Sequence, residues 1–334
     1  PDDLVAKVSG ASREDSFRYD ALKQLVFEDH ADVWMDYDRV GNRLFHRPAA
    51  VGGSESKFNA LNQLISAQET GARLDYDACG NLAAEHASQR NWNYFFDGAQ
   101  RLRRVIGDQV DIRYLYDVDG RLAQQLTKQG SQQEEVEFVY DAGKSIVLKR
   151  NGALWKVLSR GPRGDVLRVR EQRSEGTAVK WVNLLPIHDG RGNIQIILND
   201  VGQQVLRRTM DPWGKIDQYT GSADALRSID DAGGLRDDNT GHVLMGARWY
   251  SPVIGRWISP DTILAEKAAA DSVLELNNLY RYARNSPLSF MDESGSQIHV
   301  SEFLLSLKAR ENAAYAHYQQ REALHQRALD TVTK

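Results

Sequence analysis

The chain has 334 residues and a formal net charge of −4, so it is long enough to bury a substantial core, and its charge gives no reason to expect a nucleic-acid or anionic-membrane partner. Its single cysteine, Cys79, excludes an internal disulfide and a cysteine-rich metal site. No apolar run reaches the length of a membrane span, and the first residues, PDDLVAKVSG, carry neither an initiator methionine nor a signal-peptide pattern, so we expect the chain to begin inside a longer polypeptide.

An internal repeat occupies the chain from residue 17 to about residue 150. Its unit is an aromatic residue, an aspartate, two or three turn-forming residues, a basic or amide residue, and then leucine followed by alternating polar and apolar residues. The three clearest copies follow one another at intervals of 20 residues: LDYDACGNLAAE at Asp77, YFFDGAQRLRRV at Asp97 and YLYDVDGRLAQQ at Asp117. Weaker copies surround Asp20, Asp38, Asn59 and Asp141.

Each repeat predicts a strand, a turn and a returning strand. Tyrosines such as Tyr94 and Tyr114 favour strands, and an aspartate followed by Gly98 or Gly120 favours a turn in which the carboxylate accepts hydrogen bonds from its own backbone. A single hairpin is not stable alone, so the copies are expected to pair edge to edge and to bury a common face. We therefore predict an extended, curled antiparallel sheet in which the repeated tyrosines and aspartates are structural.

Strands continue from residue 145 to residue 209, although the period is lost. The segments KSIVLKRN, LWKVLSR and DVLRVREQ are typical of short strands, and turns are predicted at residues 189–192 and 199–202. His188 beside Asp189 allows two interpretations: a catalytic base with its orienting carboxylate, or a histidine at a strand end next to a turn. The second is far commoner, and we adopt it.

The stretch from residue 242 to residue 295 contains the candidate site. It begins HVLMGARWYSPVIGRWISPD and ends NLYRYARNSPLSFMDESG, and it places Arg248, Asp261 and Asp292 in short contexts marked by aromatic residues, proline or glycine. Neither a helical nor a strand period explains these contexts. Two carboxylates held close together in a partly dry site share a proton, so that one can activate water while the other protonates the scissile carbonyl or the leaving amine. The ordinary alternative is that the aspartates cap turns and that Arg248 forms a salt bridge on a strand.

Several motifs, in the right order, resemble the YD-repeat or Rhs family. HDGRGNIQIILNDVGQQVLRRTMDPWGK is similar to the entry to the family's core, and DDNTGHVLMGARWYSPVIGRWISPD is similar to the signature of the Rhs-repeat-associated core. Together with the repeats, the resemblance covers residues 17–295. It implies an all-β fold, in which YD-repeat β-hairpins wind into a hollow shell closed by a core plug; a short C-terminal helix is expected to follow.

The resemblance also implies a reaction. The family's core resembles an aspartyl self-cleaving peptidase that cuts after its final Asp-x-x-Gly. Asp261 and Asp292 match its two aspartates, Arg248 matches its arginine, and the bond between Gly295 and Ser296 matches its cleavage site. Cleaving members often carry Leu or Met where this chain has Ser296, and this difference favours an uncleaved plug.

Two further segments predict helices. The insert LAEKAAADSVLEL, between the two aspartates, is typical of a short helix, and residues 301–330 carry a loose helical stripe after an N-cap at Ser301. The tail is too short for an independent enzyme, so it is interpreted as the opening of a variable domain or as a short cargo or interaction helix. His317 and His325 lie too far apart in sequence to chelate one metal ion from one helix face.

These features predict three parts: a YD-repeat shell over residues 1–210, an Rhs-repeat-associated core over residues 211–295, and a variable tail over residues 296–334. The predicted function is to encapsulate and deliver a C-terminal toxin or effector, with self-cleavage after Gly295. In the family, Tc toxin C components and polymorphic bacterial toxins work in this way, whereas teneurins carry the shell in animals; the short repeats favour the toxin branch. The alternative is a non-enzymatic secreted or cell-surface scaffold whose core only plugs the shell.

The same interpretation defines the expected partners. They are the chain's own C-terminal segment inside the shell, the remaining shell or a B-type component with its delivery machinery, and an immunity protein for the toxin. No cofactor, metal, nucleic acid or membrane span is expected. We expect a bacterial protein that is cytoplasmic before export and is then secreted or delivered to target cells.

Overall fold

The computed structural model describes residues 7–9, 14–29, 31–48, 55–88, 90–162, 164–175, 178–189, 191–231, 234–261, 278–295 and 298–300. Within this part the secondary structure consists of β-strands and two short 3-10 helices, which confirms the all-β prediction. The helices predicted within the insert and over residues 301–330 lie outside the described residues.

Four antiparallel sheets make up the described chain. The N-terminal sheet contains β1 (Lys7–Ser9), β2 (Glu14–Tyr19), β3 (Leu25–Glu28), β4 (Val33–Tyr37) and β5 (Arg43–Pro48). The long sheet contains β6 (Lys57–Phe58), β7 (Leu64–Ser66), β8 (Arg73–Tyr76), β9 (Leu82–Ala87), β10 (Arg90–Phe96), β11 (Leu102–Ile106), β12 (Val110–Tyr116), β13 (Leu122–Gln129), β14 (Gln132–Asp141), β15 (Lys144–Arg150), β16 (Ala153–Arg160), β17 (Val166–Glu175), β18 (Ala178–His188), β19 (Ile194–Asn199), β20 (Gln204–Met210) and β21 (Ile216–Gly221).

The remaining elements are short. The inner sheet contains β22 (Asp230–Asp231), β23 (Gly234–Arg236), β24 (Val243–Met245), β25 (Arg248–Ser251) and β26 (Arg256–Trp257). A last pair joins β27 (Phe290–Met291) to β28 (His299–Val300), and the 3-10 helices are η1 (Ala223–Leu226) and η2 (Ala283–Asn285).

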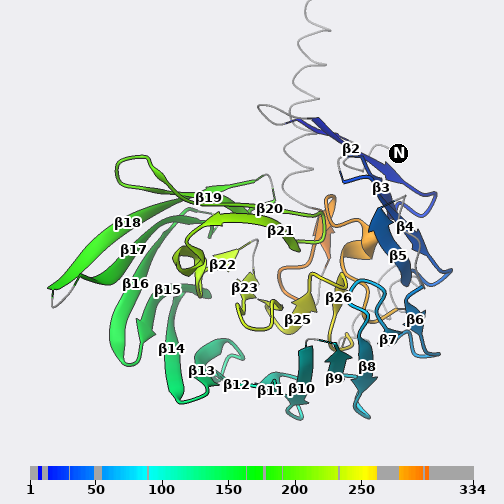
Figure 1. Ribbon diagram of the computed structural model, residues 1–334, viewed down its shortest axis with the longest axis horizontal. Coiled ribbons are helices and arrows are strands. Elements are labelled where there is room, and N and C mark those ends of the chain that lie inside the picture. Colours follow the sequence, from blue (N-terminus) through cyan, green and yellow to red (C-terminus); the bar gives the residue numbers. More distant parts are fainter. Residues whose placement is uncertain are drawn as a thin grey trace, which may run out of the picture.

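Each strand of the long sheet from β7 to β20 pairs with the strands that precede and follow it in sequence, and the edge strands β6 and β21 each pair with one of them. Hairpin after hairpin therefore builds the sheet, as the repeat predicted. Figure 1 shows this sheet and the N-terminal sheet curving around β22, β23, β25 and β26, so that they form a wall with the inner sheet on its concave side. In sheet topology the wall continues through β21, beyond residue 210; the expected division of the chain at that residue stays a prediction.

The repeated aspartates close the turns of the wall. At Asp77, Oδ1 accepts hydrogen bonds from the backbone N–H groups of Cys79 and Asn81, each at 2.9 Å, and Oδ2 accepts one from Asn81 Nδ2 at 3.0 Å. The same arrangement, with a side chain four residues on donating to Oδ2, recurs at Asp20, Asp38, Asp97, Asp117 and Asp189. The prediction that these aspartates cap their own turns is confirmed, and Asp189 is such a turn residue.

One predicted copy of the repeat differs. Asp141 pairs directly with Lys144 across a two-residue turn, and the two turn residues, Ala142 and Gly143, have φ values of 46° and 78°. A tight turn with two positive φ angles suits the twist of a hairpin. The chain therefore reverses at this position without the five-residue aspartate turn.

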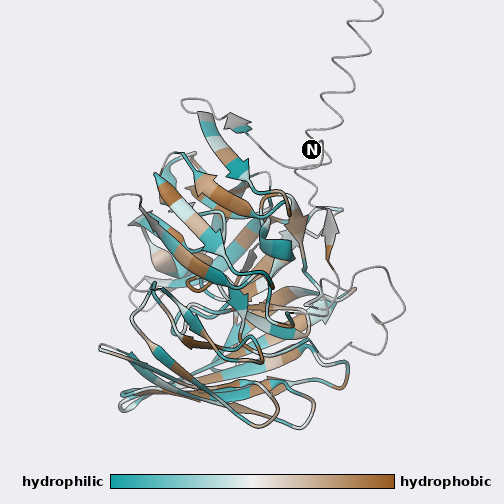
Figure 2. Ribbon diagram, turned by 90° about the vertical axis from the view of Figure 1, so that its right-hand side faces the viewer, coloured by the Kyte–Doolittle hydropathy of each residue, from teal (hydrophilic) through white to brown (hydrophobic). Residues whose placement is uncertain are grey.

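The inner sheet is buried on both faces. Leu244 and Trp249, which are cross-strand partners, belong to one apolar cluster with the wall residues from β7 to β16. Val243 and Tyr250, the next pair, belong to a second cluster with Phe17, Leu25 and Met35 of the N-terminal sheet. Alternate residues of one strand thus face opposite layers, and the inner sheet is sandwiched between the two parts of the wall. Figure 2 shows the corresponding alternation of hydrophobic and hydrophilic residues along the strands.

Tyrosines of the repeats hold the inner sheet by polar contacts. Trp249 Nε1 donates to Tyr116 Oη at 3.1 Å, and its ring lies 4.8 Å from that of Tyr114. Tyr94 Oη lies 3.2 Å from His242 Nε2. Burial lowers the pKa of His242 to about 3, so this histidine is neutral in the folded state. These contacts agree with a structural role for the repeated tyrosines.

Candidate functional site

Three short elements of the inner region supply the charged residues of the site. Arg248 is the first residue of β25, and its partner across the hairpin is Met245, the last residue of β24. Asp261 follows β26 and donates its backbone N–H to Leu279 O at 3.1 Å. Asp292 comes directly after β27. Residues that are distant in sequence therefore meet at the end of one hairpin.

Arg248 bridges the two aspartates. One of its nitrogen atoms, Nη2, lies 3.2 Å from Asp261 Oδ2 and 3.3 Å from Asp292 Oδ2. Its Nη1 donates to Leu279 O at 3.3 Å. The side chains of Arg248, Asp261 and Asp292 are 6%, 13% and 1% exposed. Charged groups that are this buried interact strongly, because little water screens them.

The third nitrogen of the same guanidinium contacts the predicted cleavage site. Arg248 Nε donates a hydrogen bond to the backbone carbonyl of Gly295. The guanidinium also lies over the ring of Trp257, with Cζ 4.1 Å from the ring centroid, and this stacking helps to fix its plane. Burial lowers the pKa of Arg248, and the charges of Asp261 and Asp292 oppose that shift.

The segment that carries Gly295 is a tight turn packed on the β24–β25 hairpin. Ser294 O accepts a hydrogen bond from the backbone N–H of Ala247 at 2.9 Å. Ser294 Oγ lies 3.2 Å from Asp292 Oδ1, and Gly295 N donates to Asp292 O at 3.4 Å. The Asp292 carboxylate therefore contacts the Ser294 side chain of its own turn and Arg248 at the same time.

The structure brings Arg248, Asp261, Asp292 and Gly295 together; Ser296 lies outside the described residues. Sequence reasoning missed Trp257 under the guanidinium and the Gly246–Ala247 turn against Ser294. The aromatic residue after Arg256 was part of a quoted motif, but nothing in the sequence connects it to Arg248. No cluster of metal-ligating side chains occurs among the described residues.

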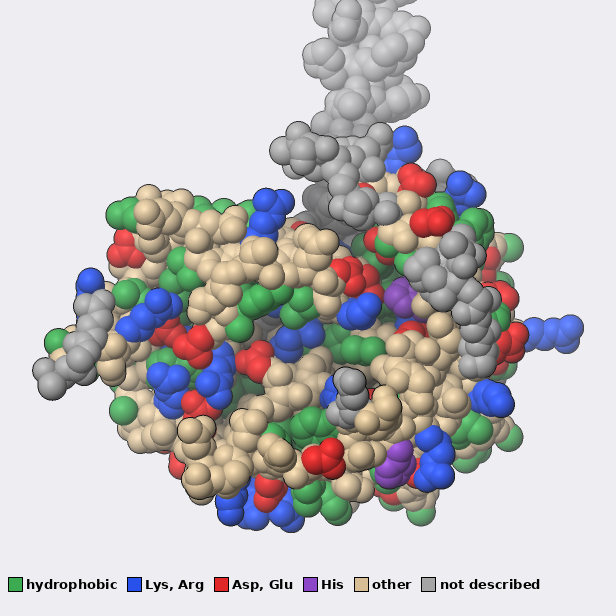
Figure 3. Space-filling model, in the orientation of Figure 1, with side chains coloured by type: hydrophobic (Ala, Val, Ile, Leu, Met, Phe, Trp, Pro, Cys, Tyr) green, Lys and Arg blue, Asp and Glu red, His purple; other side chains and the backbone are tan. Residues whose placement is uncertain are grey.

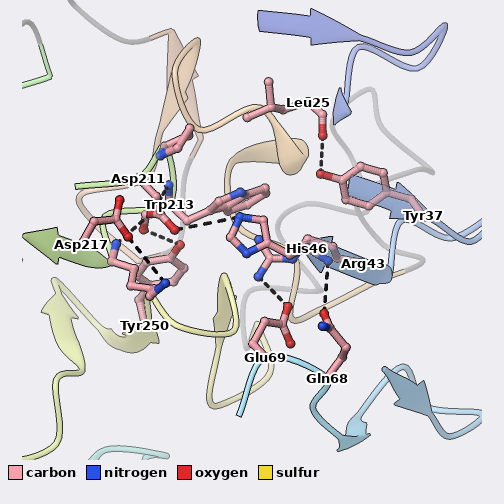
Figure 4. Close-up of polar contacts among 12 residues, drawn as sticks. Leu25, Tyr37, Arg43, His46, Gln68, Glu69, Asp211, Trp213, Asp217 and Tyr250 are labelled. Carbon is pink, nitrogen blue, oxygen red and sulfur yellow. Dashed lines mark hydrogen bonds and ion pairs between the residues drawn. The ribbon is translucent and has the colours of Figure 1, made fainter. Parts of the chain in front are cut away.

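A second group of buried charges lies where the N-terminal sheet meets turns near both edges of the long sheet, the β7–β8 turn and the β20–β21 turn. Figure 4 shows His46 beside Asp211, with Arg43 near Trp213. His46 Nε2 is 4.0 Å from Asp211 Oδ2, and Arg43 Nη2 is 3.0 Å from Glu69 Oε1. Burial raises the pKa of Asp211 to about 6 and lowers that of His46 well below its usual value. This group joins the two parts of the wall.

Glu28, on β3, should make the stability of the fold depend on pH. Burial, followed by the negative charge of Asp211, raises the pKa of Glu28 to about 7. The unfolded chain releases this proton near pH 4.5, so folding becomes less favourable as the pH rises from about 4.5 to 7. We expect the free energy of unfolding of Glu28→Gln, measured with urea, to rise by about 3 kcal/mol relative to that of the wild type between pH 4.5 and pH 7.5. An equal pH dependence in both proteins would contradict the assignment, and titrating groups that do not interact with Glu28 cancel in the difference.

No helix in the part of the chain that the structure describes is long and apolar enough to cross a membrane. Figure 3 shows Lys and Arg side chains interspersed with Asp and Glu side chains on the face it displays. The surface charge of that face is therefore mixed, in keeping with the small net charge.

The fold defines a class of protein: a β wall of Tyr-Asp hairpin repeats around a buried inner sheet. The chain belongs to the teneurin YD-shell family, because that family's model matches residues 3–288. No curated protein matches the chain.

The solved structures that the chain is similar to include TcdB2-TccC3 complexes and a Tc holotoxin pore. The crystal structure of TcdB2-TccC3-Cdc42 is 17% identical with a TM-score of 0.44, and the match covers 85% of this chain and 18% of that chain. TcdB2-TccC3 without its hypervariable C-terminal region is 17% identical with a TM-score of 0.43, covering 84% and 18%. The Tc holotoxin pore of Photorhabdus luminescens is 17% identical with a TM-score of 0.43, covering 87% and 18%. The chain thus spans about a fifth of the length of these three chains.

Proposed function

We propose that this chain is part of a toxin-delivering shell and that its inner region cleaves the backbone after Gly295. The single observation that supports the proposed cleavage is the position of Arg248. Its guanidinium contacts both carboxylates and the carbonyl of the glycine at the predicted cleavage site. A salt bridge that served only to pair charges would not need the third contact.

In the proposed reaction, water attacks the carbonyl carbon of Gly295 while one carboxylate accepts a proton from it. The negative charge that develops on the carbonyl oxygen is stabilised by the Nε–H of Arg248, which already donates to that oxygen. The other carboxyl group protonates the amine of Ser296 as the C–N bond breaks. The products are a carboxylate at Gly295 and a new amino terminus at Ser296, so atoms and charge balance.

The role of the wall in this proposal is to enclose the C-terminal segment. The support is the curvature of the two outer sheets around the inner sheet (Figure 1) and membership of the shell family. Residues 1–210 would form the shell, residues 211–295 the core, and residues 296–334 the start of the enclosed effector. Its partners would be the rest of the shell, a B-type component with delivery machinery, and an immunity protein; its place would be outside the producing bacterium.

One observation favours the non-enzymatic alternative. Strand β28 follows the predicted cleavage site and pairs with β27, which precedes it, through Phe290 with Val300 and Met291 with His299. The chain on both sides of Gly295 is thus part of one sheet. In this second candidate function the inner region is an uncleaved plug of a secreted or cell-surface scaffold.

Intact mass under denaturing conditions tests the proposal. The longest parent chain that can be expressed is compared with Asp261→Asn and Asp292→Asn after prolonged incubation of the folded protein. Asp119→Asn is the matched control, because Asp119 is an exposed residue in the β12–β13 turn of the wall. We expect the wild type and the control to be split between Gly295 and Ser296, and both site variants to stay whole. A folded wild-type chain that stays intact would exclude self-cleavage and favour the plug.

A further inference from the structure

Two glycines approach each other at the predicted cleavage site. Gly246, in the β24–β25 turn, has a φ of 51°, and a Cβ atom placed there would lie 2.2 Å from Ser294 O. Gly295 has a φ of 68°, and its Cβ would lie 2.4 Å from Met245 O and 2.8 Å from Arg248 N. All of these neighbours are backbone atoms, so no side-chain rotation can relieve the clash.

This close approach is not a general feature of the turns in the chain. Gly241, in the turn before β24, has a φ of 74°, yet a Cβ there would meet nothing within 4 Å; the same is true of Gly120, with a φ of 80°. At those positions glycine is favoured only by the positive φ angle. Gly246 and Gly295 also have a positive φ angle, and in addition their lack of a Cβ atom lets the backbone of another segment approach closely.

The contact sets the position of the scissile carbonyl. The hairpin backbone at Ala247 donates to Ser294 O at 2.9 Å, and the side chain of the next residue, Arg248, donates to Gly295 O. Two successive carbonyls of the turn are therefore held by two successive residues of the hairpin. Because catalysis depends on placing reacting atoms within about 0.5 Å, a displacement of this turn would move the Gly295 carbonyl away from the carboxylates.

We propose that the turn from residue 245 to residue 248 is the subsite that selects glycine before the scissile bond, and that Gly246 is a positioning residue for cleavage. The subsite has no side-chain pocket; it excludes every residue with a Cβ by the backbone of the hairpin. The inference rests on the proposed self-cleavage, and it assigns the specificity of that reaction to residues that do not carry the chemistry.

The test compares Gly246→Ala and Gly295→Ala with Gly241→Ala in the longest parent chain. Gly241→Ala places a side chain at a similarly positive φ angle, in the β23–β24 turn of the inner sheet, without the clash. It therefore controls for backbone strain. The rate constant of cleavage is measured by intact mass on the folded fraction, together with its pH profile. We expect both clashing variants to cleave at least tenfold more slowly than Gly241→Ala, with an unchanged pH profile because the carboxylates are intact.

The outcomes separate the two proposals. A wild type that cleaves, together with Gly246→Ala and Gly295→Ala variants that cleave as fast as Gly241→Ala, would overturn the subsite and leave self-cleavage standing. A wild type that never cleaves would overturn both. If one clashing variant fails to fold, the other decides, since each places its methyl group on a different side of the contact.

Discussion

Arg248→Met is expected to abolish cleavage after Gly295 and to lower the free energy of unfolding by about 3–5 kcal/mol. The side chain is the shared partner of Asp261 and Asp292, which are 13% and 1% exposed. Without it, two buried carboxylates face each other with no cation between them, and Gly295 O loses a charged donor. Urea unfolding measures the change in the free energy of unfolding, and intact mass after incubation measures the loss of cleavage.

Two further variants separate charge from geometry at this position. Arg248→Lys keeps the charge, but an ammonium group has no planar fork to reach two carboxylates and a carbonyl together, so cleavage should still be lost while part of the stability returns. Arg248→Met combined with Asp292→Asn removes one buried carboxylate as well and should recover stability without activity. An Arg248→Met protein that cleaves at the wild-type rate would show that the guanidinium has no part in the reaction.

Trp249→Ala is the second change with a large expected effect, a loss of about 3–5 kcal/mol in the free energy of unfolding. The side chain is 2% exposed and joins the inner sheet to the wall. Its ring packs at a tilt against that of Tyr114, and its Nε1–H donates to Tyr116 Oη. Thermal or urea unfolding followed by tryptophan fluorescence measures the loss.

Trp249→Phe separates packing from hydrogen bonding, since it keeps an aromatic ring and loses the Nε1–H donor. We expect the lost hydrogen bond to lower the free energy of unfolding by about 1 kcal/mol, in addition to the loss caused by the smaller side chain. Trp34→Ala is the control for removal of an indole, because Trp34 is 43% exposed; its cost should be much smaller. Equal losses for the Trp249 and Trp34 variants would mean that the inner sheet does not depend on this contact with the wall.

Much of the fold could be predicted because its signal is local. An aspartate turn needs only five consecutive residues, as at Asp77, and each hairpin places the next strand beside the last. The order of strands in the wall therefore follows the order of repeats in the sequence. The copy at Asp141 is also a hairpin, but the shorter Ala142–Gly143 turn closes it in place of the five-residue aspartate turn.

The site could be predicted only as a set of residues. Arg248, Asp261, Asp292 and Gly295 stand in recognisable motifs, and the structure brings them together; their catalytic roles stay predictions. The stacking of Arg248 on Trp257 and the contact of Gly246 with Ser294 could not have been found in the same way. These contacts join segments whose separation is set by packing, not by any periodic pattern.

The sequence by itself determined the strands, their turns and the succession of hairpins, because hydrogen bonds between neighbouring residues decide them. Only the tertiary structure decided that the inner sheet is buried on both faces and that one guanidinium meets two carboxylates and a glycine carbonyl. Burial depends on what packs against a strand from elsewhere in the chain, so residues such as Arg248 and Gly295 acquire their partners only when segments that are distant in sequence come together.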